Sequence, residues 1–186
     1  AFQSSRVSNE EITRSLGVLA GLAIEGEAFV SALSPGRQRA PWIGNCVSVG
    51  EAAFRLDPLD SGALQAIHTS ISHLVALFPI DADAMPEAAP FNTGVAAHAD
   101  NIRDFQIAHY RLNRRFDDPF WNAARETPPP DTLAYKLKLF AARGELALYD
   151  DETFQEENWQ ALFIGHGLMP RETNPLIDAL VPAEQI

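Results

Sequence analysis

The chain has 186 residues, 46% hydrophobic and 21% charged, which is typical of a globular protein with a sizeable core. Its net charge of −11 disfavours nucleic acid as a partner, because the field repels phosphate backbones. A single cysteine excludes an intramolecular disulfide and a cysteine-based zinc site. The single cysteine suits a reducing cytoplasm, so we expect a cytoplasmic protein. The sequence contains no run of about 18 apolar residues, so we expect no transmembrane helix and no membrane partner.

The first fifty residues carry the signals for one helix and for the β structure. Residues 8–11 form a capping-box pattern, and apolar residues then recur at helical spacing until Gly21. We predict a strand at residues 28–33 that forms a hairpin with residues 37–39. Residues 42–49 are the strongest candidate for a strand.

The rest of the chain is predicted to be almost entirely helical. Apolar residues step by three and four positions, and prolines and glycines mark the ends of each stretch. A segment with two prolines and many alanines, residues 80–93, is predicted to be a connecting loop. The predicted helices cover residues 61–78, 95–116, a short stretch from Pro119, 131–143, 155–164 and a last short stretch from Pro175. The fold class is therefore mainly α with a small β portion.

A strand, a tight loop and a helix start follow one another between Pro41 and Phe78. The strand reads GNCVSVG, and the loop and helix start read DPLDSGAL. Such an arrangement can present backbone N–H groups and a carboxylate to a ligand. This stretch resembles the flavin-dependent tryptophan halogenase family, whose members carry GNCVAIG followed by a PLES-type motif. Residues 102–121 continue the resemblance to a family phrase of the form IRDFIxxHYxLxxRxDxPFW.

The resemblance implies a particular place for this chain in a larger fold. Residues 1–79 would be the C-terminal remnant of an FAD-binding α/β module of the flavin monooxygenase-like kind, with its strands and a long helix. Residues 80–186 would be a helical domain on the substrate side. No Gly-rich GxGxxG turn is present, nor are the family's catalytic lysine and its WxWxIP signature, so the resemblance covers only the C-terminal portion of a family member.

The resemblance also implies site residues at the start of the helix. Asp60 stands where the family has a glutamate that helps position the substrate and the halogenating species, and it is the candidate catalytic residue. The backbone N–H groups of Gly62 and Ala63 would form a concave anion-binding site, or nest, for the halide. Backbone N–H groups do not depend on side-chain identity, so such a site is compatible with these residues. From the residues alone, Asp60 is equally a helix N-cap, and Gly62 and Ala63 are equally the first turn of a buried helix.

Cofactor-binding residues are implied on the strand, on the loop after it and on the helix, namely Gly44, Asn45, Glu51 and Leu64. The alternative for the strand is a structural one, in which it ends in a turn at Gly50 and Cys46 is a small buried hydrophobic residue. No metal site is expected, because the five histidines show no metal-binding spacing.

The implied reaction is the halogenation of an electron-rich aromatic molecule such as tryptophan. The family uses reduced FAD supplied by a flavin reductase, O2, and chloride or bromide. We expect this chain to be inactive alone and to need an N-terminal FAD-binding half as its partner, with a homodimer also open. Two alternatives stay open: a non-catalytic helical interaction module, and a degenerate halogenase homologue in which Asp60, Gly62 and Ala63 mark lost turnover.

Overall fold

The computed structural model describes residues 7–21, 25–26, 29–60, 62–81, 84–114, 117–172 and 175–176. The chain divides into two compact units, residues 1–34 and residues 35–186. Helices dominate the described residues, and each strand is only two residues long. These observations confirm the prediction of a mainly α chain with a small β portion.

The first unit contains helix α1, Asn9–Ala20. The side chain of Ser8 accepts the backbone N–H of Glu11 at 3.2 Å, which satisfies one of the unpaired donors at the helix start. Gly21 ends the helix with a φ of 64°, a conformation that glycine adopts without steric cost. Both predicted ends of this helix are therefore confirmed.

Strand β1, Gly36–Arg37, pairs antiparallel with strand β4, Phe54–Arg55. The predicted hairpin between residues 28–33 and residues 37–39 is wrong, because residues 29–33 form no strand and the partner of β1 lies 18 positions further along the chain. Residue 28 lies outside the described residues. A pairing of this kind depends on tertiary contacts and leaves no periodic signal in the local sequence.

Strand β2, Trp42–Ile43, forms a hairpin with strand β3, Cys46–Val47. The continuous strand predicted for residues 42–49 is wrong, because the chain reverses at Gly44 and the next residue. Gly44 has a φ of 57°, and a glycine with positive φ at the first central position is typical of a type II′ hairpin turn. A short 3-10 helix, η1 (Gly50–Ala52), follows the hairpin.

Helix α3, Ala88–Leu112, is the central element of the second unit. Its 25 residues give a length of about 37 Å. The loop predicted for residues 80–93 is wrong over its last part, because α3 begins at Ala88. Pro90 lies in the first turn, where a missing backbone N–H breaks no helical hydrogen bond. Position 116, at the end of the predicted stripe, lies outside the described residues.

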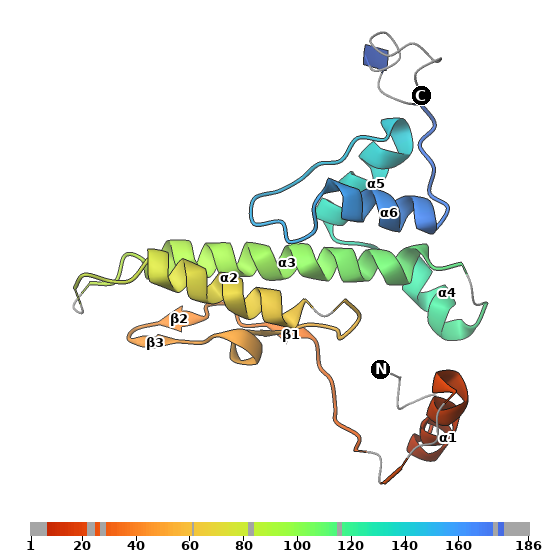
Figure 1. Ribbon diagram of the computed structural model, residues 1–186. Helices are drawn as coiled ribbons and strands as arrows, with labels where there is room; N and C mark the ends of the chain where they lie inside the picture. Colours follow the sequence, from red (N-terminus) through yellow and green to blue (C-terminus); the bar gives the residue numbers. More distant parts are fainter. Residues whose placement is uncertain are drawn as a thin grey trace. The chain divides into compact units, whose positions relative to one another are not determined.

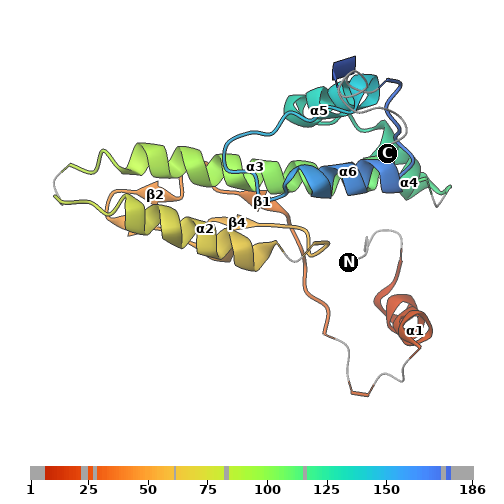
Figure 2. The same ribbon diagram turned by 45° about the horizontal axis from the view of Figure 1, so that its top comes forward.

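The other helices pack on both sides of α3. In Figure 1 α2 and the short strands lie on one side of α3, and α5 and α6 lie on the other; Figure 2 shows α2 and α5 on opposite sides of α3 from a second direction. Their bounds agree with the predicted ones within two residues, and the last predicted helix, from Pro175, lies almost wholly outside the described residues. The helices are α2 (Ala63–Ala76), α4 (Pro119–Glu126), α5 (Asp131–Arg143) and α6 (Glu156–Gly165).

Two hydrophobic clusters share α3, one along each half of the helix. The first joins the N-terminal half to α2 and the strands through Trp42, Ala53, Phe54, Ala66, Phe91, Val95, Ala99 and Ile102. The second joins the C-terminal half to α5 and α6 through Phe105, Ala108, Leu133, Phe140, Trp159, Leu162 and Phe163. The position of every element in this unit therefore depends on α3.

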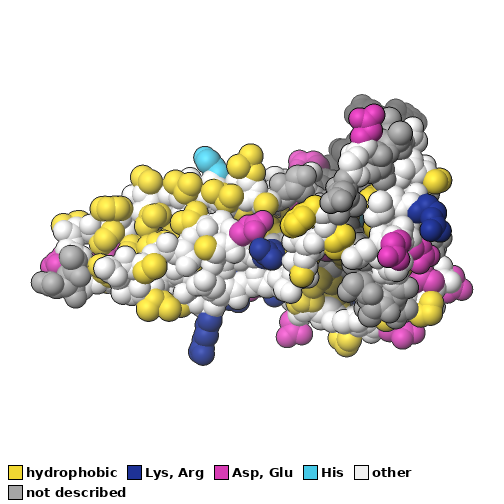
Figure 3. All heavy atoms as spheres, turned by 90° about the horizontal axis from the view of Figure 1, so that it is seen from below, with side chains coloured by type: hydrophobic (Ala, Val, Ile, Leu, Met, Phe, Trp, Pro, Cys, Tyr) yellow, Lys and Arg dark blue, Asp and Glu magenta, His cyan; other side chains and the backbone are white. Residues whose placement is uncertain are grey.

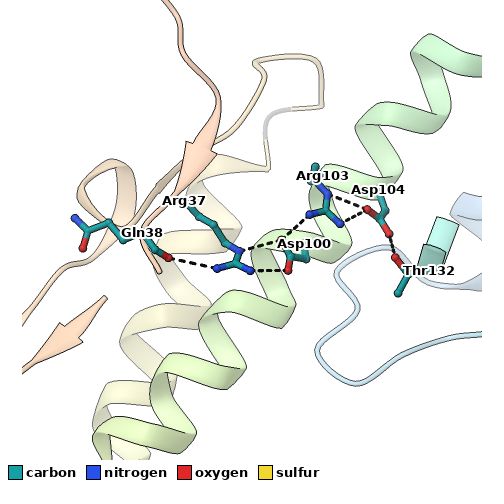
Figure 4. Close-up of polar contacts among 6 residues, drawn as sticks. All are labelled: Arg37, Gln38, Asp100, Arg103, Asp104 and Thr132. Atoms are coloured by element: carbon teal, nitrogen blue, oxygen red, sulfur yellow. Dashed lines mark hydrogen bonds and ion pairs between the residues drawn. The ribbon is translucent and has the colours of Figure 1, made fainter. Parts of the chain in front are cut away.

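A ladder of charged groups ties β1 and α5 to the same helix (Figure 4). Arg37 forms two hydrogen bonds with Asp100, at 2.9 and 3.0 Å. Arg103 bridges Asp100 and Asp104, at 2.9 and 2.7 Å. The hydroxyl of Thr132 in α5 donates to the second oxygen of Asp104. The ladder fixes the rotation of α3 relative to its neighbours.

Candidate functional site

One side chain of α3 holds the turn that precedes α2. The Nε2 of Gln106 donates to the carbonyl of Asp57 at 2.8 Å, and the backbone N–H of Asp57 donates to Oε1 of Gln106 at 3.2 Å. Gln106 is only 5% exposed. Its amide thus pairs with both backbone groups of Asp57, as a neighbouring strand would. The pairing attaches the turn to the C-terminal half of the central helix.

The carboxylate of Asp60 in the same turn has one paired and one unpaired oxygen. Oδ1 accepts the backbone N–H of Gly62 at 3.0 Å and Nε2 of Gln106 at 3.1 Å. Oδ2 is buried, and no donor among the described residues reaches it. A buried carboxylate oxygen without a donor is costly, so Oδ2 is the atom of this turn that is best suited to a ligand.

Asp60 is not the N-cap of α2. The helix starts at Ala63 with Gly62 in the N-cap position, so Asp60 is not the N-cap residue itself. Its carboxylate nevertheless accepts the N–H of Gly62, two residues further along the chain, and so satisfies a donor at the helix start as that alternative expected. This short-range bond is the one that aspartate forms in an Asx-turn. The length of the side chain therefore decides where its free oxygen lies.

The second carboxylate of the turn is held by a tyrosine of α3. The hydroxyl of Tyr110 donates to Oδ2 of Asp57 at 2.9 Å. Burial, together with the hydrogen bond to Asp57, raises the pKa of Tyr110 to about 12. The ring also stacks on Trp121, with ring centroids 5.8 Å apart. The hydroxyl of Tyr110 thus pairs with one oxygen of Asp57, whereas Oδ2 of Asp60 has no donor among the described residues.

The two residues of the expected halide nest lie directly beside Asp60. The N–H of Gly62 is already a donor to Oδ1 of Asp60. A Cβ added to Gly62 would lie 3.1 Å from that oxygen and 3.5 Å from Ile102. A side chain at this position would therefore require the Asp60 carboxylate to move by a few tenths of an ångström. Ala63 is exposed at the first position of α2. Halide binding here stays a prediction, and an anion would have to displace Asp60 from Gly62.

Glu51 and Leu64, two of the expected cofactor residues, are both exposed. Glu51 pairs with Arg55 at 3.2 Å, and Leu64 is 75% exposed. Glu51 and Ala63 both line a small cavity of about 40 Å³, whose lining residues are Gly50, Glu51, Phe54, Leu56, Ala63 and Ile67. That volume admits a water molecule and not a flavin ring. A ring bound at these residues would need a second wall from elsewhere.

Gly44 and Asn45 lie at the tip of the β2–β3 hairpin, and both are exposed. No atom lies within 4 Å of a Cβ built on Gly44, so its place is explained by the turn and not by close approach of the backbone. The hairpin is anchored by Asn92, which accepts the N–H of Trp42 at 2.7 Å. Asn92 and Gln106 are about four turns apart on α3, roughly 21 Å. The structure therefore does not bring the hairpin tip to Asp60.

Cys46 is exposed, so the prediction of a small buried hydrophobic residue is wrong. The reason is the hairpin, which turns this side chain outward. In the described part of the chain, no group of three histidine, cysteine or acidic side chains is arranged to hold a metal ion. His98 is a buried residue with a satisfied ring, whose Nδ1 lies 3.0 Å from the carbonyl of Asp151, and burial lowers its pKa. None of the helices among the described residues is both long and apolar enough to cross a membrane.

Sequence analysis missed Gln106 and Tyr110 as members of this site. Gln106 stands four positions after Ile102 and is one of several polar side chains that are buried on α3. A polar amide at such a position needs a hydrogen-bond partner, which is a signal that the sequence does carry. The identity of that partner depends on how α2 and α3 pack together.

Comparison with known proteins agrees with the geometry. The family described as tryptophan halogenase matches residues 1–182. The tryptophan 7-halogenase KtzQ of Kutzneria sp. (strain 744) is 33% identical over 158 residues, which are 77% of this chain and 30% of that protein.

Solved structures give the same result. BrvH, a flavin-dependent halogenase from Brevundimonas sp. BAL3, matches with a TM-score of 0.82 and 37% identity, over 99% of this chain and 37% of that one. The tryptophan 6-halogenase SttH from Streptomyces toxytricini matches with a TM-score of 0.85 and 26% identity, over 99% and 37%. The chain thus spans about a third of the length of these relatives. With 182 of its residues matched by the family, the chain belongs to the tryptophan halogenases.

Proposed function

We propose that this chain supplies the carboxylate side of a flavin-dependent halogenation site in a longer protein. The observation that carries the proposal is Oδ2 of Asp60, which is buried and has no donor among the described residues. We propose that Asp60 stands in for the glutamate that the resemblance implies at this position. An oxygen of this kind gains most from a donor that a substrate brings to it. The proposed substrate is an electron-rich aromatic molecule such as tryptophan.

Each predicted site residue has a role in this proposal. Bound reduced FAD, supplied by a flavin reductase, would provide the electrons with which O2 and chloride or bromide become hypohalous acid. Asp60 would orient the aromatic molecule or the halogenating species through Oδ2. Ala63, and Gly62 once Asp60 releases it, would donate backbone N–H groups to the halide. The exposed residues Gly44, Asn45, Glu51 and Leu64 would lie along the cofactor.

The exposed apolar face of α2 supports a partner for this chain. Leu64, Ile71, Val75 and Phe78 share one face of the helix and its C-terminal end, and they are 75%, 47%, 71% and 71% exposed. Hydrophobic side chains also gather over the part of the unit that contains α2 and the short strands (Figure 3). Such a surface is typical of an interface. We propose that an N-terminal FAD-binding half covers it.

The proposed partner also gives a role to the two parts of the chain. Residues 1–79 would complete the FAD-binding module, and residues 80–186 would form the helical substrate side. In the structure α2 and α3 belong to one compact unit, so the proposed boundary is one of function and not of folding. Alone, the chain would supply only one side of the flavin site, and we expect it not to catalyse halogenation.

The test is an assay of the intact protein with FAD, a flavin reductase, chloride and tryptophan or indole. Mass spectrometry should detect a chlorinated product that requires both reduced flavin and halide. The 186-residue chain alone should give none. Chlorination by the isolated chain would show that the site is complete without a partner half.

Two observations favour other functions. The uncovered face of α2 also fits a non-catalytic interaction module or a homodimer, in which a partner chain or a second copy covers it. The N–H of Gly62, already occupied by Asp60, fits a degenerate homologue with a closed halide nest. A folded intact protein that binds FAD but forms no halogenated product from any indole would favour the degenerate homologue.

A further inference from the structure

We infer that Gln106 is a positioning residue for Asp60, and that it selects which carboxylate oxygen is offered to a ligand. Gln106 is nearly fully buried in the C-terminal half of α3, and its amide contacts only the turn before α2 in the polar bonds that the structure describes. The catalytic consequence of this inference rests on the proposed function. The geometric part, that Gln106 fixes the turn, does not.

The chemistry of the contacts requires a glutamine. One hydrogen of Nε2 goes to the carbonyl of Asp57 and the other to Oδ1 of Asp60, while Oε1 accepts the N–H of Asp57. Two donors and one acceptor on one planar group are what an amide provides. Glutamate would keep the acceptor but lose both donors and repel Asp60. Methionine has similar bulk and would lose all three bonds.

These bonds decide the direction of the Asp60 carboxylate. Oδ1 is held from two sides, by Gln106 at 3.1 Å and by the N–H of Gly62 at 3.0 Å. Rotation of the carboxylate out of this orientation would break both bonds, and a half-turn only exchanges two equivalent oxygens, so one oxygen stays without a donor among the described residues. Since α3 carries both hydrophobic clusters, Gln106 connects Asp60 to the helix on which the packing of the unit depends.

The first measurement is amide hydrogen exchange by NMR in the intact protein, for wild type, Gln106→Met and Gln106→Glu. Gln106→Met should raise the exchange rates of the Asp57 and Gly62 amides at least tenfold, because both depend on this clamp. Gln106→Glu should leave Asp57 protected, since Oε1 remains, and should raise exchange at Gly62. The control is Gln160→Met, which removes a surface contact to Glu156 and should change neither amide.

The second measurement is a double-mutant cycle in turnover. Gln106→Met should lower kcat/KM for halogenation about tenfold to a hundredfold, because a misplacement of about 1 Å has effects of that size. In an Asp60→Asn background the same change should have less than about a threefold effect, because the carboxylate that Gln106 positions is absent.

The outcomes separate this inference from the proposed function. Absence of turnover in wild type would remove the proposed function, and the exchange rates would still decide whether Gln106 fixes the turn. Unchanged exchange at Asp57 and Gly62 in Gln106→Met would overturn the inference. The inference would also be overturned if Gln106→Met lowered turnover by the same factor in wild type and in the Asp60→Asn background. If Gln106→Met does not fold, the Gln106→Glu pattern decides in the same way.

Discussion

The side-chain amide of Gln106 lies 3.1 Å from Oδ1 of Asp60, although 46 positions separate the two residues in the sequence. The contact links the turn before α2 to the helix that carries both hydrophobic clusters. A change in the packing of α3 should therefore reach the candidate site directly, even where it touches no ligand. The stability of the unit that holds this helix therefore bears on the site.

The buried end of the charged ladder should matter more for stability than its exposed end. Thr132→Val removes the donor to Asp104, whose side chain is 4% exposed, and should lower the free energy of unfolding by about 1–2 kcal/mol. Arg37→Met removes a pair with Asp100 in which both side chains are 34% exposed, and should cost less than about 1 kcal/mol. Urea unfolding measures both, and the reverse order would contradict the ladder's role.

Lys136 is a buried cation that should be essential to the second cluster. It is 1% exposed, pairs with Glu152, and lies 4.2 Å from the ring centroid of Trp159. Lys136→Met should lower the free energy of unfolding by about 3 kcal/mol, because Glu152 becomes an unpaired buried charge. The double variant Lys136→Met/Glu152→Gln should recover most of that loss. If thermal unfolding shows that the double variant is no more stable than Lys136→Met, the loss of stability comes from packing and not from the unpaired charge of Glu152.

Gly94 should not tolerate alanine, although it lies in a helix. A Cβ at Gly94 would lie 2.9 Å from two ring atoms of His73, where α2 and α3 pack together. We expect Gly94→Ala to cost about 1–2 kcal/mol, against the gain that alanine usually brings to a helix. Gly165 has no atom within 4 Å of the added Cβ, so Gly165→Ala should be neutral or stabilising. Equal unfolding midpoints for the two variants would contradict this packing.

Tyr110 should give stability a distinct dependence on pH. Its pKa is raised from 10.0 to about 12 in the folded chain, by burial and by the bond to Asp57. Between these values the unfolded chain has lost the phenolic proton that the folded chain still holds. The free energy of unfolding should therefore be highest, for this group, below pH 10, and should fall as the pH rises to about 12.

The control for this pH dependence is Tyr110→Phe. The extra fall above pH 10 should disappear in that variant, while Tyr135→Phe should keep it. Urea unfolding at several pH values measures the difference. An identical profile for wild type and Tyr110→Phe would show that this phenol ionises alike in both states.

The helices were largely predictable, because most carry apolar residues at helical spacing and most end at or near a proline or glycine. The start of α4 at Pro119 agrees with the prediction, and there the Asp118 side chain accepts the N–H groups of Phe120 and Trp121. The strands were not predictable, since each is two residues long and its pairing depends on tertiary contacts. A period of two has no room to appear in so short a segment.

The site was predictable only in part. The motif order placed Asp60 and Gly62 next to each other, and the structure shows a bond between them. Gln106 and Tyr110 reach the turn from 46 and 53 positions away, through the packing of α3 against the first cluster. A pattern within a short stretch of sequence cannot predict a contact between residues so far apart in the chain. The sequence does place Gln106 four positions after Ile102, at helical spacing from the apolar stripe of this helix.

The most direct test of the account is the rate of aromatic halogenation by the intact protein, supplied with reduced FAD and chloride, for wild type and Asp60→Asn. We expect the variant to be about a hundredfold slower, because it loses the carboxylate that we propose orients the aromatic molecule or the halogenating species. The matched surface change Asp117→Asn, at a side chain that is 94% exposed, should leave the rate unchanged. Equal rates for wild type and Asp60→Asn would contradict the account.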